Sequence, residues 1–199
     1  LQANLDTKLH ATEQIKASFG KYSIESPTHF EIHDSGKFEH IQLVEDKELE
    51  SAFVFYLRRD IDGDRDKKWP KGKERQRIEI KGYQSSPDPM KAGNAENHQI
   101  EWYLKIEKSF QINKEFCHFF QLKAVGTKNT DDPLLTLSGV MDHGQPQLQL
   151  QWWSGHDSGR VFLVDWEKCK DKWLRCECVA NYSKKGSIHF SLLSLDGKI

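Results

Sequence analysis

The sequence predicts an all-β protein, a sandwich of two antiparallel sheets with a short helix near its N-terminus. The first observation behind this prediction is that about ten short segments alternate apolar and polar residues, as half-buried strands do. The second is that turn-forming stretches such as DIDGD, SSPDP and HGQP separate these segments. So many antiparallel strands bury their apolar faces best as two packed sheets.

The helix is predicted over residues 11–20, ATEQIKASFG. Ile15 and Phe19 recur at the four-residue spacing of one helix face, Thr12 is a candidate N-cap, and Gly20 can end the helix. Every later element is predicted as a strand: 29–33, 40–44, 51–59, 75–83, 98–107, 117–125, 134–140, 147–153, 160–166, 174–182 and 187–195. The length of 199 residues suits a single domain over residues 1–199.

The charge balance argues against nucleic acid as a partner. The 29 Lys and Arg residues nearly cancel the 30 Asp and Glu residues, so no overall field draws the chain to nucleic acid or to an anionic membrane. No apolar run is long enough to span a bilayer, and the first residues lack the shape of a signal peptide. We expect a soluble monomer that binds neither nucleic acid nor membrane.

Three of the four cysteines cluster in CKDKWLRCEC, at Cys169, Cys176 and Cys178. This spacing matches no common zinc site, and it leaves open a disulfide between Cys169 and one of the other two. Cys117 is expected to be a small buried apolar residue.

Several predicted strands carry a polar face that suits a sugar. One such face bears Gln147, Gln149, Gln151 and Trp153, and another bears Gln121 and Lys123 together with Phe119 and Val125. Amides bond hydroxyl groups, aromatic rings cover the apolar side of a sugar ring, and cations neutralise a uronate carboxylate. The strand RQRIEIKGY is divided in the same way, with Ile78 and Ile80 on one side and the other side charged: Arg75, Arg77, Glu79 and Lys81. That charged side is either a solvated face of paired charges or the floor of a site for a charged substrate.

These segments together resemble a known family. RQRIEIK, HFFQLKAVG, LLTLSG, QLQLQWW and the stretch from DWEKC to LDGKI are similar to the jelly-roll polysaccharide lyases, the group of the alginate and glucuronan lyases. The resemblance implies a concanavalin-like β-jelly roll that is secreted and cleaves an anionic, glucuronan-like polysaccharide by β-elimination. It also implies that no cofactor is required.

The resemblance assigns roles to residues that match the family's strands. Arg77 and Gln121 hold the uronate carboxylate and so stabilise the enolate-like intermediate. Lys123, at a position where many alginate lyases have His, is the base or a charge stabiliser. Glu79 orients the cations. The remaining residues bind substrate: Arg75, Lys81, Gln149 and Gln151, with Trp153 as a sugar platform.

The chain departs from the family in one place. The late strand of the form Y-x-K-x-G-x-Y, whose Tyr exchanges a proton with the substrate, does not occur. Either the chain lacks the last strand or the group comes from elsewhere, and the substitutes are His118, Tyr103 and Tyr83.

A metal site is a separate hypothesis. Asp60, Asp62 and Asp64 in DIDGDRD suggest a structural calcium ion, because hard cations prefer several oxygens from one tight turn. The order of residues does not match an EF-hand, and a solvated hairpin loop is the competing interpretation.

Two other functions compete with a lyase. A non-catalytic glycan-binding module would use the same amide and aromatic face without chemistry. A glycoside hydrolase of the same sandwich class would need two carboxylates across a cleft, commonly as E-x-D-x-x-E, which does not occur.

Overall fold

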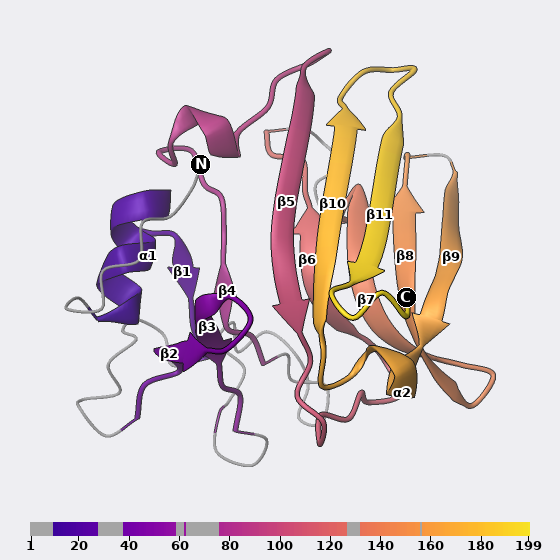
Figure 1. Cartoon of the computed structure of the whole chain (residues 1–199). Coiled ribbons are helices and arrows are strands. Elements are labelled where there is room, and N and C mark those ends of the chain that lie inside the picture. The colour runs from indigo at the N-terminus through magenta and orange to yellow at the C-terminus, as the bar shows by residue number, and fades with distance from the viewer. Residues whose placement is uncertain (1–9, 28–37, 59–61, 63–75, 127–131, 156) are drawn as a thin grey trace. The chain divides into compact units, whose positions relative to one another are not determined.

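The computed structural model describes residues 10–27, 38–58, 62, 76–126, 132–155 and 157–199. The chain divides into two compact units, Leu1–Gly93 (unit 1) and Asn94–Ile199 (unit 2) (Figure 1). The prediction of one domain, with or without a missing last strand, stays a prediction. Within the described residues, none of the helices has the length and apolar character needed to cross a membrane.

Unit 1 combines a helix with two short antiparallel pairs of strands. Its elements are α1 (Ala11–Phe19), β1 (Ile24–Glu25), β2 (Ile41–Asp46), β3 (Glu50–Phe55), β4 (Glu79–Ile80) and the 3-10 helix η1 (Asp88–Met90). β2 pairs with β3, and β1 pairs with β4. Ala11 and Ile15 of the helix pack with Ile41, Ile78 and Ile80 to form the core of this unit.

The helix begins and ends close to the predicted positions. Thr12 is not its cap, because the helix starts two residues earlier than that role requires: His10 occupies the N-cap position, and Thr12 is buried in the first turn. The N–H of Gly20 donates to the carbonyl of Lys16 at 2.9 Å, and Gly20 has φ 102°, a conformation that favours glycine.

The segment 75–83 is a strand for only two of its described residues, Glu79 and Ile80. Its apolar side is nevertheless as predicted, since Ile78 and Ile80 both face the core of unit 1. The strand predicted at 29–33 lies outside the described residues.

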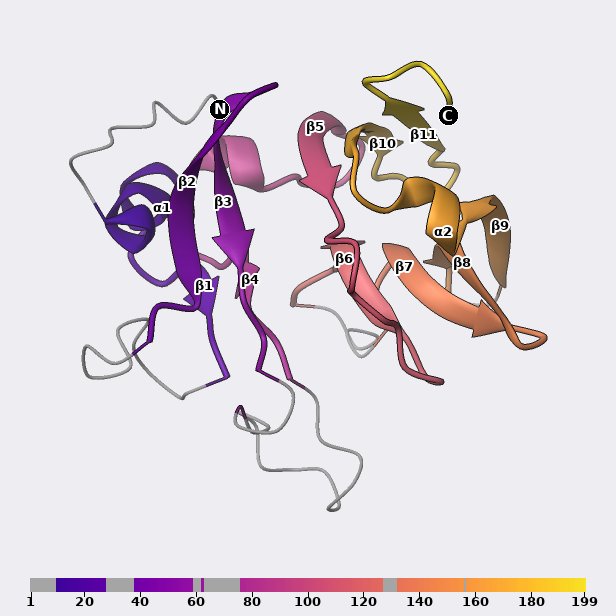
Figure 2. The same ribbon diagram turned by 60° about the horizontal axis from the view of Figure 1, so that its bottom comes forward.

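Unit 2 contains the longer strands (Figures 1 and 2). They are β5 (Asn97–Lys105), β6 (Cys117–Leu122), β7 (Leu135–Asp142), β8 (Gln145–Trp153), β9 (Ser158–Asp165), β10 (Trp173–Asn181) and β11 (Ile188–Ser194), with the short helix α2 (Trp166–Cys169) before β10. Three strands form one sheet in the order β11-β10-β5, and four form another in the order β6-β7-β8-β9. All of these pairings are antiparallel.

The core of unit 2 lies between these two sheets. Leu137 and Leu148 of the four-stranded sheet share a buried cluster with Leu174 and Cys176 of the three-stranded sheet. The rings of Trp102 and Phe120 stack across the core with their centroids 4.2 Å apart. Residues from both sheets therefore bury one common apolar layer. The prediction of a mostly β protein with antiparallel sheets is confirmed.

All four cysteines are free thiols, so the disulfide left open for Cys169 is not formed. Cys169, Cys176 and Cys178 are fully buried. Burial raises the pKa of the thiol to about 11 for Cys169 and Cys178 and to about 12 for Cys176. These cysteines act as small core residues and are poor nucleophiles.

Each edge strand of the four-stranded sheet contains an irregularity that changes which residues face outward. In β6 the register shifts between His118 and Phe120, so Phe119 is an extra residue. In β9 the register also shifts: Leu148 pairs with Val164 and Gln149 pairs with Phe162, so Leu163 between them is an extra residue. A bulge breaks strict alternation, and here it turns two consecutive apolar side chains toward the core at each edge.

Candidate functional site

The outer side of the four-stranded sheet carries two rows of side chains that we call the polar face. The register places His118, Ser138, Gln149 and Phe162 side by side in one row, and Gln121, Thr136, Gln151 and Arg160 in the next. The inner side of the same strands is apolar, with Leu135, Leu137, Leu148 and Leu150 in the core. The polar face therefore lies on the side opposite the core.

The bulge in β6 brings His118 and Gln121 onto the same side. Strict alternation would put His118 with Phe120 in the core and Phe119 outside, which is what the sequence pattern indicates. The structure corrects this, since Phe119 packs on Phe110 and Trp166 in the core. Because Ser138 and Thr136 are two residues apart along β7, the rows of His118 and Gln121 are about 7 Å apart.

A chain of hydrogen bonds joins the imidazole of His118 to the neighbouring strand. Nδ1 of His118 lies 2.7 Å from Oγ of Ser138, and this hydroxyl donates to Oγ1 of Thr136 at 2.8 Å. Both hydroxyl residues have 0% exposure. The ring of Phe116 stacks on His118 with a centroid distance of 4.3 Å. The imidazole is thus held at its edge and on its face.

Gln149 is the buried member of the polar face, with 1% exposure. Its Nε2 donates to Oε1 of Gln147 at 2.9 Å. Its own Oε1 has no hydrogen-bond partner among the described residues. A buried amide oxygen without a donor costs on the order of 1–3 kcal/mol, so Gln149 is held in the sheet at a cost in stability.

This cost leads to a prediction for Gln149→Met. Methionine has a similar shape and leaves no acceptor unsatisfied, so we expect the free energy of unfolding to stay the same or to rise by about 1 kcal/mol. Urea denaturation measures the free energy of unfolding, and Gln151→Met, at a half-buried position, is the control. A decrease of about 2 kcal/mol or more in the free energy of unfolding of Gln149→Met would contradict the conclusion that Oε1 of Gln149 has no hydrogen-bond partner.

Three further residues lie at the ends and edge of this face. Lys123 follows the last residue of β6 and is exposed, so it lacks the desolvation that a lysine base would need. Trp153, the predicted sugar platform, is the last residue of β8 and is half-buried. Phe162 is 51% exposed beside Gln149 on the edge strand β9. Since an exposed aromatic ring next to amides is typical of sugar sites, Phe162 is a second candidate platform.

Sequence reasoning missed Thr136, Ser138 and Phe162. A signal existed for the first two, because LLTLSGV alternates hydroxyl residues with leucines. No alternation pattern could have found Phe162, since only the bulge in β9 turns it outward.

Tyr103 does not lie near this face. It is on β5 in the other sheet, 41% exposed, and its neighbours Trp102 and Leu104 face the core. Gln121 points outward from the opposite sheet of the sandwich. The core separates Tyr103 from Gln121, so the structure does not bring together this part of the predicted catalytic set.

The charged side of β4 forms its own network in unit 1. Lys81 Nζ lies 2.8 Å from Glu25 of the paired strand, and Arg77 Nη1 lies 3.5 Å from the same carboxylate. Arg77 is also 3.9 Å from Glu79. Two cations and two carboxylates therefore neutralise one another, as the alternative of paired charges predicted. Arg75 lies outside the described residues. The resemblance to the lyases also implies that the strands of Arg77 and Gln121 lie side by side. In the described sheets β4 pairs with β1 and β6 pairs with β7, so these two strands are not paired there.

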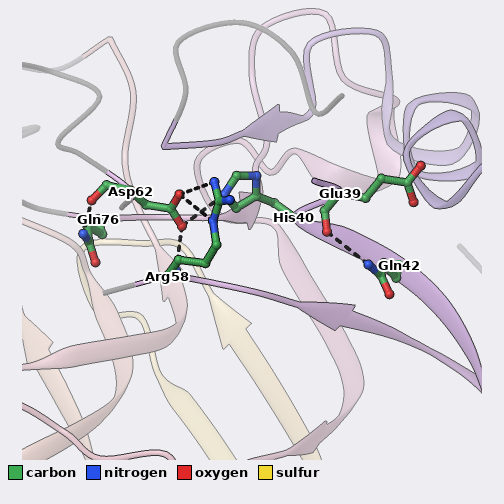
Figure 3. Close-up of polar contacts among 6 residues, drawn as sticks. All are labelled: Glu39, His40, Gln42, Arg58, Asp62 and Gln76. Carbon is green, nitrogen blue, oxygen red and sulfur yellow. Dashed lines mark hydrogen bonds and ion pairs between the residues drawn. The ribbon is translucent and has the colours of Figure 1, made fainter. Parts of the chain in front are cut away.

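A second polar centre in unit 1 is buried (Figure 3). The carboxylate of Asp62 accepts from the backbone N–H of Arg58 at 2.6 Å and from its guanidinium at 2.8 Å and 3.1 Å. Nε2 of His40 lies 3.0 Å from Oδ2 of Asp62, the oxygen that accepts from the backbone N–H of Arg58, and the side chains of His40 and Asp62 are both 0% exposed. Gln76 also bonds the carbonyl of Asp62.

This arrangement bears on the calcium hypothesis. Both oxygens of Asp62 are already engaged by Arg58 and His40, and a carboxylate paired with a guanidinium is a poor calcium ligand. No cluster of metal-ligating side chains occurs within the described part of the chain. Asp60 and Asp64 lie outside it, so the calcium site stays a prediction.

Comparison with known proteins gives no relative. No family model matches the chain, and neither a curated protein nor a solved structure matches it.

Proposed function

We propose that this protein is a polysaccharide lyase that cleaves a glucuronan-like uronate polymer by β-elimination on the polar face of unit 2. One observation carries the proposal: the bulge in β6 turns His118 and Gln121 onto one outward face, in two rows whose backbone positions are about 7 Å apart. A base and a carboxylate-binding amide at that separation fit a single sugar residue. The amides and aromatic rings around them suit its neighbours along the polymer.

The chemistry follows from the residue types. The amide of Gln121 and the ammonium of Lys123 bind the uronate carboxylate and stabilise the negative charge that develops on it. The imidazole of His118 removes the proton on C5. The electron pair of that C–H bond forms the C4–C5 double bond while the C4–O4 bond breaks. The protonated imidazole gives this proton to O4, which requires that the C5 proton and O4 lie on the same side of the sugar ring.

This assignment changes two of the expected roles. His118 takes the part of the base, because Lys123 is exposed and suits a charge stabiliser. The part predicted for Arg77 in binding the carboxylate stays a prediction outside this proposal, since Arg77, Glu79 and Lys81 belong to the charged network of unit 1. The jelly-roll form of the sandwich, secretion and the absence of a required cofactor belong to the same proposal and rest on the resemblance of the strands to the lyase family.

A second function is favoured by a specific observation. The exposed ring of Phe162 beside Gln149 and Gln151 forms a sugar-binding surface that needs no catalytic group. A glycan-binding module without catalysis is therefore the alternative.

The experiment that tests the proposal uses the ultraviolet absorbance of the double bond formed by elimination. The protein is incubated with polyglucuronate, alginate and a neutral glucan. We expect absorbance to rise with polyglucuronate, and we expect Gln121→Ala to slow the rise by about 10² to 10³-fold. Gln84→Ala, an exposed position in unit 1, is the control. Binding without any rise would favour the glycan-binding module, and neither binding nor a rise would reject both functions.

A further inference from the structure

The hydrogen-bond chain beside His118 determines the position of a proton. Ser138 has one hydroxyl proton, and it lies in the bond to Oγ1 of Thr136. The proton in the contact between Ser138 and His118 must then come from the imidazole. With this order of donors, Nδ1 of His118 is the N–H donor to Ser138 and Nε2 carries the lone pair, which is one of the two tautomers that the 2.7 Å contact allows.

Burial strengthens this assignment. Ser138 and Thr136 both have 0% exposure, so bulk water does not offer Ser138 another acceptor. The pairing of His118 with Ser138 fixes the imidazole opposite this hydroxyl, and Phe116 covers one face of the ring. The ring has little freedom to turn away from Ser138.

We propose that Ser138 and Thr136 are positioning residues that hold His118 in its Nδ1–H tautomer and so make Nε2 the basic atom. The value of this arrangement for catalysis rests on the proposed function, since only a lyase needs Nε2 as base. The tautomer itself does not rest on it. Thr136 does not contact the imidazole itself. It acts through Ser138, because it accepts the hydrogen bond that Ser138 would otherwise donate to Nδ1.

Nitrogen-15 NMR of the full chain tests the tautomer without any substrate. Spectra are recorded at about pH 8, where a histidine of ordinary pKa is neutral, and the His118 signals are assigned by their loss in His118→Asn. In the unaltered protein we expect Nδ1 to give the signal of a protonated nitrogen and Nε2 that of an unprotonated one.

Two substitutions are expected to act differently. In Thr136→Val, which keeps the β-branched shape, Ser138 loses its acceptor and donates to Nδ1, so the two ring-nitrogen signals exchange character. In Ser138→Ala the constraint is removed, and signals of both tautomers are expected. Gln147→Ala, which lies outside the chain of hydrogen bonds, should leave the spectrum unchanged.

The outcomes separate this inference from the proposed function. A protonated Nε2 in the unaltered protein, or an unchanged spectrum in Thr136→Val, would overturn the inference even if the protein is a lyase. The expected spectra with no activity on any uronan would support the tautomer and reject the lyase. If the protein is a lyase, Thr136→Val should also lower its rate by about tenfold or more while thermal stability stays close to that of the unaltered protein.

Discussion

His118→Asn should abolish most of the proposed β-elimination while leaving the fold of unit 2 in place. The Asn amide can still donate to Ser138, but it cannot accept the C5 proton, so we expect the rate on polyglucuronate to fall by about 10² to 10⁴-fold. The measurement is the initial rate of ultraviolet absorbance at saturating polymer. Thermal denaturation of the same samples reports the fold.

The matched control is His189→Asn. His189 is exposed on β11, in the sheet that does not contribute to the polar face, and its replacement should leave the rate unchanged. A normal rate in His118→Asn would show that another group removes the proton. Lys123 would then return as the candidate base, and Lys123→Ala would be the next variant to measure.

Asp62→Asn should destabilise unit 1 more than any surface substitution there. Replacing the carboxylate leaves the cation of Arg58 with a neutral partner, and it removes the negative charge beside the buried imidazole of His40. Breaking a buried pair costs about 3 to 5 kcal/mol, and the lower end applies here because Arg58 is 28% exposed. Hydrogen exchange of the amides in β2 and β3 measures the loss of stability in this unit.

The same carboxylate gives unit 1 an acid dependence. Burial alone would raise the pKa of Asp62, but the hydrogen bonds from the backbone and guanidinium of Arg58 and from His40 outweigh it and lower the pKa. A lowered pKa contributes stability that is present above the unfolded-state value of about 3.9 and is lost as the pH falls through the folded-state value. We therefore expect protection of β2 and β3 to decline below about pH 4, and this decline to be weaker in Asp62→Asn.

The control for both measurements is Asp88→Asn. Its carboxylate lies 3.0 Å from Lys91 but is 99% exposed, and such pairs contribute about 0 to 1 kcal/mol. Equal losses in Asp62→Asn and Asp88→Asn would mean that the buried pair does not stabilise unit 1.

The sequence predicted most of the strands because their periodicity follows from burial on one side. Strands β2, β3 and β5 to β11 lie within a few residues of the predicted segments, and the apolar sides of β5 and β8 face the core as expected. The apolar half of 75–83 was also predicted correctly, through Ile78 and Ile80. A face of paired charges was one of the two interpretations, but its partner could not be predicted, since Glu25 is more than fifty residues away and only the pairing of β1 with β4 brings it there.

The candidate site shows where periodicity stops being sufficient. The sequence by itself determined the amide face of β8, because Gln149 and Gln151 alternate with leucines that must be buried. It placed Phe119 on the outer face, and it gave Phe162 no role. Only the tertiary structure decided these positions. Phe119 packs on Trp166 and Phe120 packs on Trp102, so both consecutive side chains face the core, and this requires the bulge in β6. Local alternation carries no information about such a bulge, since the packing that stabilises it comes from residues distant in the chain.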